Sequence, residues 1–275
     1  MHRYHHAAAA AATLCVTILV TAGCASTGGA GPSPDVAPPA TTLDVRDEVG
    51  ANGLPTPNAL LARYVDALGG EVALRRHESS TRKGKMSIAA MGMEGATTVH
   101  AAAPDRMVMN IETGMGAMNQ GFNGKVGWSD NPMTGAQVLA GDQLANMKQQ
   151  ADFYMPLNYT RHFTSMETVE ETDFNGAAAY KVRLVSSTGR EALHFFDRSS
   201  SLLIGIQGVQ DGPMGESEVK ISFSDYKDFG GVKMPAKTLI DVAGMQIEQT
   251  VDTVTYDDVD ASAFEPPEAV RAQLK

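Results

Sequence analysis

The feature that most constrains the fold of this chain is a long succession of short segments in which apolar and polar residues alternate. About twelve such segments lie between Arg82 and Tyr256, and Gly, Pro, Asn and Asp separate them. Because successive side chains of a strand point to opposite faces, each segment is predicted to form a half-buried β-strand. So many antiparallel strands must either close on themselves or curl around something that covers their inner face.

Two helical segments accompany the predicted strands. The first begins at Thr56-Pro57, which supplies an N-cap and a proline at the first helical position, and it ends at Gly69-Gly70. The second covers Gln143 to Phe153 and is predicted to end at Tyr154-Met155-Pro156. The strands are expected on either side of this second helix, at residues 82–90, 97–103, 106–112, 117–122 and 126–129 before it and 167–173, 178–185, 191–197, 202–210, 216–228, 232–242 and 246–256 after it.

We therefore expect a mainly β (α+β) fold. Its strongly curved antiparallel sheet would wrap over one or two helices, since strands of this number need a covered inner face. The last residues, 260–275, are predicted to form a capping tail with Phe264 as its buried plug.

The N-terminal residues have the order of a bacterial secretory signal. A polar stretch with Arg3 precedes an uncharged apolar run, Ala7 to Val20, which is too short to span a bilayer. Small residues and then Cys24 follow. This order resembles the bacterial lipobox, although Thr21 stands where leucine is most common. The resemblance implies that residues 1–23 are removed and that Cys24 receives diacylglycerol and a further acyl chain.

The alternative is an ordinary signal peptide followed by a coincidental cysteine. Ala25 follows Cys24 instead of the aspartate that often retains lipoproteins in the inner membrane. The resemblance therefore implies the outer membrane, facing the periplasm. Residues 24–55, rich in Pro, Gly and Ala, are expected to be a flexible tether, because they lack the apolar periodicity of a packed element. Residues 56–275 would then form one β domain.

Composition narrows the classes of partner. The chain has two cysteines, and the loss of Cys15 with the signal would leave no intramolecular disulfide. The same loss removes Arg3 and brings the formal charge from −10 to −11. Such an acidic chain lacks the basic stripe that nucleic acid requires, and it is not attracted to anionic lipid by charge. We therefore expect contact with a membrane through the acyl chains at Cys24.

Three runs of residues resemble a known family. They are YVDALGG at 64–70, FNGKVGW at 122–128 and DYKDFGGVKMP at 225–235. These runs resemble the lipoprotein-sorting and lipoprotein-carrier proteins of the LolA/LolB-like superfamily, and the resemblance covers residues 58–267. It implies an unclosed β-barrel with a helical lid around an apolar cavity for acyl chains. The receptor member of this family is an outer-membrane lipoprotein, which Cys24 would match, and residues 114–118 are nearest in character to its protruding apolar loop.

No catalytic or metal-binding motif is found in the sequence. The histidines that would remain after cleavage, His77, His100, His162 and His194, have no neighbours at metal-ligand spacing. Adjacent carboxylates such as Glu170-Glu171 would point to opposite faces of a strand, which argues against a shared acid–base site. We therefore expect neither an enzyme nor a cofactor.

Methionine is the one unusual component of the composition. Seven methionines crowd the region from Met86 to Met118, and Met is favoured where a surface must adapt to varied apolar shapes. Three interpretations remain open: ordinary core filling, the wall of a lipid cavity, or a Cu(I) site of thioethers with His100 as a further ligand. Either of the last two would use Met91 with Met93 and Met107 with Met109, since each pair would share one face of a strand.

The predicted cavity wall comprises Met86, Met91, Met93, Met107, Met109, Phe122 and Trp128. Trp128, the only tryptophan, could lie at the mouth of a cavity or in the core. Two functions follow from these observations. The first is a membrane-anchored lipoprotein that binds a lipid or the acyl chains of lipoproteins. The alternative is a copper-binding or purely structural envelope lipoprotein.

Overall fold

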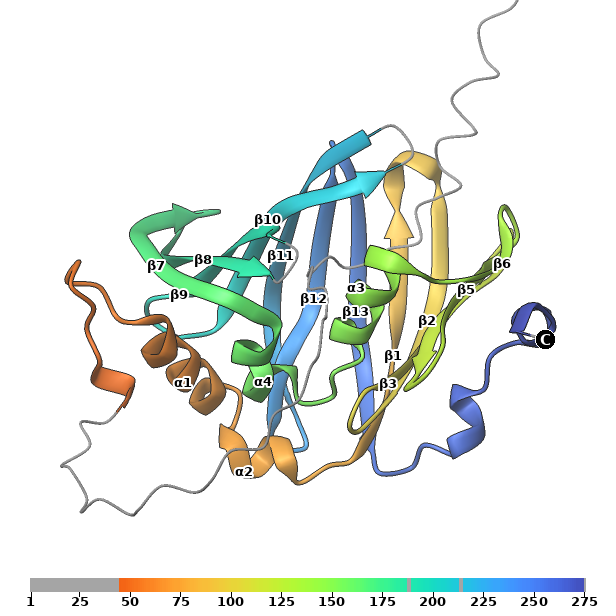
Figure 1. Cartoon of the computed structure of the whole chain (residues 1–275), viewed down its shortest axis with the longest axis horizontal. Helices are drawn as coiled ribbons and strands as arrows, with labels where there is room; N and C mark the ends of the chain where they lie inside the picture. The colour runs from red at the N-terminus through yellow and green to blue at the C-terminus, as the bar shows by residue number, and fades with distance from the viewer. Residues whose placement is uncertain (1–44, 187–188, 213–214, 275) are drawn as a thin grey trace, which may run out of the picture.

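The computed structural model describes residues 45–186, 189–212 and 215–274 (Figure 1). The signal segment, Cys24 and most of the predicted tether lie outside these residues. The strands are β1 (Ser79–Ile88), β2 (Met93–Ala102), β3 (Arg106–Thr113), β4 (Gly116–Asn123), β5 (Gly127–Asn131), β6 (Gly135–Val138), β7 (Phe163–Phe174), β8 (Ala177–Ser186), β9 (Glu191–Asp197), β10 (Leu203–Gly212), β11 (Gly215–Phe229), β12 (Val232–Val242) and β13 (Met245–Tyr256).

These strands form one 13-stranded antiparallel sheet. The order is β6-β5-β4-β3-β2-β1-β13-β12-β11-β10-β9-β8-β7, so the two predicted groups of strands make two contiguous halves. The halves meet where β1 pairs with β13. Strands β6 and β7 end the sheet and do not pair with each other, so the barrel is unclosed. The expectation of a curved, open antiparallel sheet is therefore confirmed.

The joint between the two halves depends on a glycine. Gly84 of β1 lies beside a bulge of β13, where the pairing moves from Lys83–Thr253 to Gly84–Val251. A Cβ at Gly84 would lie 1.8 Å from the backbone oxygen of Thr250. Only glycine permits this approach, and the bulge adds twist and bend at the place where the sheet must curl.

The first helix forms where the sequence predicts it. In α1 (Pro57–Ala67), Thr56 is the N-cap, and its side chain accepts a hydrogen bond from the backbone N of Ala59 at 3.2 Å. The short α2 (Gly70–Arg75) follows and leads into β1. Leu60 and Tyr64 of α1 are buried against the sheet.

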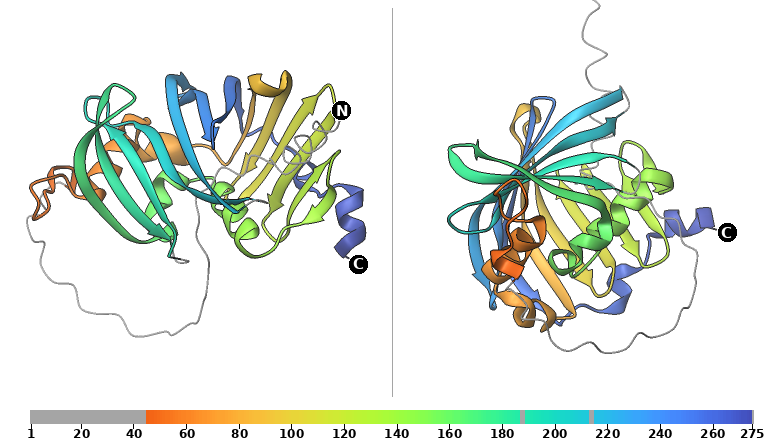
Figure 2. Two further views of the ribbon diagram at one scale, coloured as in Figure 1. Left: turned by 90° about the horizontal axis from the view of Figure 1, so that it is seen from above. Right: turned by 60° about the vertical axis from the view of Figure 1, so that its left-hand side comes forward.

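Three helices lie inside the curve of the sheet. They are α1, α3 (Gly141–Gln150) and α4 (Met155–His162), and the views from the front and from above agree on this placement (Figures 1 and 2). The other side of the sheet, its convex face, carries the C-terminal segment, with the short helices η4 (Ala261–Phe264) and α5 (Glu268–Arg271). Phe264 is buried there, as predicted for a plug.

Helix α4 and strand β6 were not predicted from the sequence. Helix α4 begins at Met155, because Pro156 occupies the first turn of a new helix, where its missing N–H removes no intrahelical hydrogen bond. The expectation that Pro156 only ends the preceding helix was therefore wrong. Strand β6 has just four residues and no alternation of buried and exposed positions, which left it without a sequence signal.

Candidate functional site

The inner, concave face of the sheet is the candidate site, because it is apolar and three helices partly cover it. The buried side chains that form its main cluster, called the concave cluster below, come from α1, α4 and both halves of the sheet. They are Leu60, Tyr64, Leu68, Met86, Ile88, Met109, Ile111, Tyr159, Phe163, Val182, Leu184, Phe196, Leu203, Ile206, Val219, Ile221, Ile240 and Ile247.

Methionines are the flexible part of this face. Met86 and Met109 are buried members of the concave cluster. Five more methionines pack against it while partly buried, namely Met93, Met118, Met155, Met166 and Met245. An unbranched thioether side chain changes shape at little cost, so this lining can adjust to apolar ligands of different length.

A second, smaller cluster continues the concave face beneath α3. Met147 and Ala151, from α3 and the residue that follows it, pack on Ala101, Met107 and Phe122. Pairing of the strands places Met107 beside Phe122 and Met109 beside Gln120. The two methionines of β3 therefore share one face, as predicted, but they belong to neighbouring clusters.

The structure separates the seven residues of the predicted wall. Met86, Met107, Met109 and Phe122 are buried on the concave face, and Met93 is partly buried there. Met91 instead lies in a 3₁₀ turn, η3 (Ala89–Met91), and is 40% exposed. The expectation that Met91 and Met93 share a strand face was wrong, because the turn at Gly92, with φ of 60°, interrupts the strand.

Trp128 lies on the opposite side of the sheet from the other wall candidates. It is fully buried in a cluster with Ala102, Val108, Phe264 and Val270, beneath the C-terminal segment. Strand alternation explains this position, since Trp128 pairs with Gly121 whereas the concave Phe122 pairs with Gly127. Trp128 therefore contributes to the attachment of the C-terminal segment.

The residues considered for copper do not converge. His100 follows Val99 on β2, and its ring Nδ1 lies 3.1 Å from the hydroxyl of Thr81, on the convex side. Met107 and Met109 face the concave side. Within the described residues, no group of three or more His, Cys, Asp or Glu side chains is placed to hold a metal ion.

An aromatic contact fixes α4 on the sheet. The hydroxyl of Tyr159 lies 3.1 Å from Nδ1 of His194, which is on β9. The Tyr159 ring also meets Tyr64 of α1 edge to face, with ring centroids 6.4 Å apart. Burial raises the pKa of both tyrosines above the usual value and lowers the pKa of His194 to about 3. The His194 side chain is therefore uncharged at neutral pH, which is compatible with its apolar surroundings.

This buried histidine predicts a loss of stability in acid. The unfolded chain binds a proton at His194 near the ordinary pKa of about 6.5, whereas the folded chain does not until about pH 3. Folding is therefore opposed increasingly as the pH falls between these values, by about 3 kcal/mol at about pH 4. Urea unfolding of His194→Gln should lack this component, and equal pH dependence in the two proteins would contradict it.

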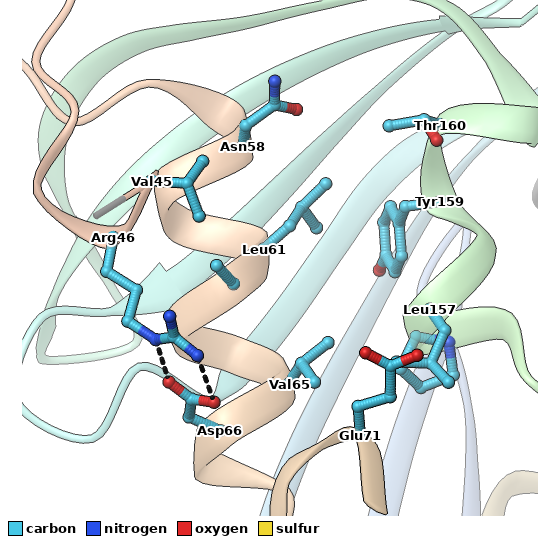
Figure 3. A pocket seen from close by; sticks show the side chains of 12 residues that line it. Val45, Arg46, Asn58, Leu61, Val65, Asp66, Glu71, Leu157, Tyr159 and Thr160 are labelled. Carbon is cyan, nitrogen blue, oxygen red and sulfur yellow. Dashed lines mark hydrogen bonds and ion pairs between the residues drawn. The ribbon is translucent and has the colours of Figure 1, made fainter. Parts of the chain in front are cut away.

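A pocket between α1 and α4 opens beside the concave cluster. Its volume is about 320 Å³, and its apolar lining includes Val45, Leu61, Val65 and Leu157 (Figure 3). Tyr159 lines the pocket and is also a buried member of the concave cluster. An ion pair between Arg46 and Asp66 lies at its rim.

A second hollow, of about 530 Å³, lies at the β1–β2 end of the sheet. Most of its lining comes from the convex face, and it includes Lys85, Glu94, Glu112 and Glu248. Glu248 pairs with Lys237 at 2.7 Å. This charged lining is unsuited to an acyl chain.

Sequence reasoning missed several polar residues of the concave side. Arg82 is on β1 and Tyr256 is on β13, and the contact of Tyr159 with His194 joins α4 to β9. Arg82 carries a signal that could have been read, since it alternates with Gly84, Met86 and Ile88 on the apolar face of one strand. A charge at such a position is unusual, because ionised side chains are almost never buried unless they are paired.

Comparison with solved structures identifies the fold. A LolA superfamily protein from Nitrosomonas europaea has a TM-score of 0.52 at 12% sequence identity, over 77% of this chain and 98% of that protein. A DUF1329 family protein from Desulfovibrio piger has a TM-score of 0.54 at 9% identity, over 75% of this chain and 96% of the other. No protein-family model and no curated protein sequence matches the chain. The expected LolA/LolB-like fold is confirmed, and identities this low support the fold alone.

Among the described residues, no helix combines the length and the apolar character needed to cross a bilayer. Met115, in the region likened to the receptor's apolar loop, lies at the β3–β4 turn and is 60% exposed.

Proposed function

We propose that this chain, which has the LolA/LolB-like fold, is an extracytoplasmic lipoprotein that binds the acyl chain of a lipid or lipoprotein on its concave face. The observation that carries the proposal is the concave cluster, with seven methionines in it or against it. Methionine fills gaps in ordinary cores, and it is also favoured on surfaces that must adapt to apolar ligands of different shape. Binding of an acyl chain needs no catalytic group, and we assign none.

The hydrophobic effect supplies enough free energy for this task. Each buried methylene group contributes about 0.8 kcal/mol, so an acyl chain of about 14 carbons contributes roughly 10 kcal/mol before ordering costs. The partly buried side chains of Met93, Val99 and Met118 mark the half of the face where a chain could be covered further.

The pocket between α1 and α4 is the route of access in this proposal. Apolar side chains of both helices line it, and its Tyr159 reaches the concave cluster. On the sheet side, α4 is held by the contact of the Tyr159 hydroxyl with Nδ1 of His194 and by the edge-to-face contact of the two rings. The carboxylate of Asp152, just before the helix, contacts Asn158 and His162 of α4.

The remaining parts of the proposal concern location. Residues 1–23 would be cleaved, Cys24 lipidated, and residues 24–55 would act as a tether for one β domain, 56–275. The acyl chains at Cys24 would hold the domain at the outer membrane on its periplasmic side. The lipobox-like order of Ala22-Gly23-Cys24 supports this location.

Identification of a ligand that co-purifies with the protein tests the proposal and requires no choice of probe. A secreted form that begins at Ala25 contains every described element and has no lipidation site. We expect organic extraction and mass spectrometry of this form to yield about one acyl-chain lipid per protein, enriched over a mock purification. A folded protein that carries no acyl lipid, and that binds none when lipid is added, would favour a purely structural role.

A further inference from the structure

Arg82 is a partly buried cation whose Nε has no hydrogen-bond partner. It lies on the concave side of β1, two residues from Gly84 and four from Met86, a buried member of the concave cluster. Its Nε is buried without a hydrogen-bond partner, and no described residue forms a hydrogen bond or an ion pair with its guanidinium. Burial also lowers the pKa of Arg82, while the nearby Tyr256 acts in the opposite direction.

Two more unpartnered polar groups lie on the same face of the adjoining strand. Tyr256 and Gln249 are on β13, where they pair across the joint with Ser80 and Met86. The hydroxyl of Tyr256 and the Nε2 of Gln249 are both buried, and neither finds a partner among the described residues. Ser80 and Arg82 lie on the same face of β1, two residues apart. Tyr256 pairs with Ser80 and is therefore a diagonal neighbour of Arg82 across the two strands. Three potential donors therefore face the concave side from one pair of strands.

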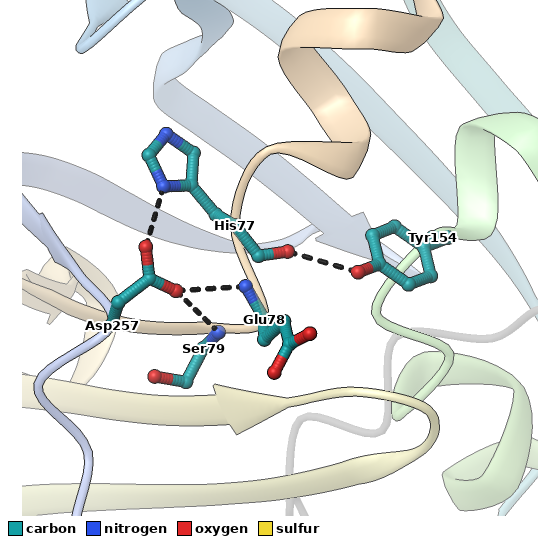
Figure 4. A network of polar contacts seen from close by, with 5 residues as sticks. All are labelled: His77, Glu78, Ser79, Tyr154 and Asp257. Carbon is teal, nitrogen blue, oxygen red and sulfur yellow. Dashed lines mark hydrogen bonds and ion pairs between the residues drawn. The ribbon is translucent and has the colours of Figure 1, made fainter.

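Nearby carboxylates do not neutralise Arg82. Asp257 is exposed and accepts hydrogen bonds from the backbone N of Glu78 and Ser79, at 2.8 and 3.2 Å, and its other oxygen lies 2.8 Å from Nδ1 of His77 (Figure 4). Asp228 is also exposed and accepts from the backbone N of Gly231. Each carboxylate is thus engaged at the end of the sheet and makes no contact with the guanidinium.

The same network holds Tyr256 in place. The rings of His77 and Tyr256 stack with centroids 3.9 Å apart. Asp257 fixes one edge of His77, and the hydroxyl of Tyr154, just before α4, donates to the backbone oxygen of His77 at 2.9 Å (Figure 4). The hydroxyl of Tyr256 is therefore fixed in position before any ligand arrives.

A guanidinium whose Nε is buried without a partner is costly, because arginine cannot relieve the cost by losing its proton. An anion that enters from outside the protein would complete the pair and offset this cost. A planar guanidinium suits a carboxylate or a phosphate, which it can bind through two parallel hydrogen bonds. Arg82 pairs with Val99 of β2, which in turn pairs with Met109 of β3. Apolar side chains of the concave face therefore begin directly beside the charge.

We propose that Arg82, with the hydroxyl of Tyr256, binds the acid head group of an anionic amphiphile whose acyl chain lies along the concave cluster. This inference rests on the proposed function and sharpens it. It predicts that the protein prefers a lipid with a carboxylate or phosphate at the end of its chain. Uncharged lipids, and acyl chains that end in an ester or amide, lack the group that Arg82 needs.

The test compares matched ligands and matched variants of the form that begins at Ala25. The ligands are palmitate, hexadecyl phosphate and uncharged methyl palmitate, each measured by displacement of an uncharged fluorescent acyl probe at about pH 8, where the acids are ionised. The variants are Arg82→Met, which removes the charge, and Lys83→Met, which removes an equal charge from the exposed, convex side of the same strand.

The wild-type protein should bind palmitate or hexadecyl phosphate about ten- to a hundredfold more tightly than methyl palmitate, the usual worth of a charge-assisted hydrogen bond. Arg82→Met should lose this preference while it still binds methyl palmitate, and Lys83→Met should keep it. Palmitate preferred over hexadecyl phosphate, or the reverse, identifies the acid. If Arg82→Met does not fold, Arg82→Gln takes its place in the comparison.

Equal binding of charged and uncharged ligands by the wild-type protein would overturn the inference and leave the proposed function intact. A preference that survives Arg82→Met would also overturn it. Absence of binding to all three ligands would instead contradict the proposed function, and the inference with it.

Discussion

Replacing Cys24 by serine is expected to abolish acylation of the protein and to leave an uncleaved or soluble precursor. Cys24 is the only thiol outside the predicted signal segment, so no other residue can receive the diacylglyceryl group. The effect should be all or none. Metabolic labelling with an alkyne fatty acid, followed by detergent-phase partitioning, measures both acylation and anchoring.

The sequence provides a matched control for this experiment. Cys15 lies within the apolar run of the signal, so Cys15→Ser changes the same chemical group without touching the lipobox-like residues. It should be labelled and partitioned like the wild-type protein. Labelling of Cys24→Ser at the wild-type level would contradict the proposed lipoprotein anchor.

Two methionines on the concave face are expected to have the largest effect on ligand binding. Met93 and Met118 are partly buried and pack against the concave cluster. Replacing both by glutamine would place amides against the acyl chain, and each buried amide without a partner costs about 1–3 kcal/mol. Affinity for a fluorescent fatty acid should fall at least about tenfold, by the same arithmetic.

The control for these substitutions uses methionines that the structure leaves in solvent. Met115 and Met133 are 60% and 53% exposed, and their replacement by glutamine should leave affinity unchanged. Met107 and Met109 are poorer choices for the test, because both are buried and their loss would also lower the stability of folding. Equal affinities of the two double variants would show that the concave methionines do not contact the ligand.

Much of the fold could be predicted from the sequence because its signals are local. Alternation placed twelve strands, and the bounds of β9 and β12 agree with the predicted segments. Thr56 and Pro57 marked the start of α1 for reasons of capping chemistry. The pairing of β1 with β13 is different, since it joins residues far apart in the chain and depends on the bulge opposite Gly84. No local pattern predicts that contact.

The site was harder to predict. Where other elements cover both faces of a strand, apolar residues occur on both faces, and the sequence does not show which of them is concave. Trp128 reads as a wall residue by its neighbours in sequence, yet the C-terminal segment covers its face of β5. Met91 reads as part of a strand, yet Gly92 turns the chain there. Arg82 required knowledge of its surroundings, since only the structure shows that its buried Nε has no hydrogen-bond partner.

The central claim is that the concave face binds an acyl chain, and an equilibrium titration tests it most directly. The form that begins at Ala25, stripped of bound lipid, would be titrated with a fluorescent fatty acid while circular dichroism confirms that it remains folded. The account predicts saturable binding of about one probe per chain with a Kd of about 1 μM or lower. A folded, monomeric protein that shows no saturable binding at such concentrations would contradict it.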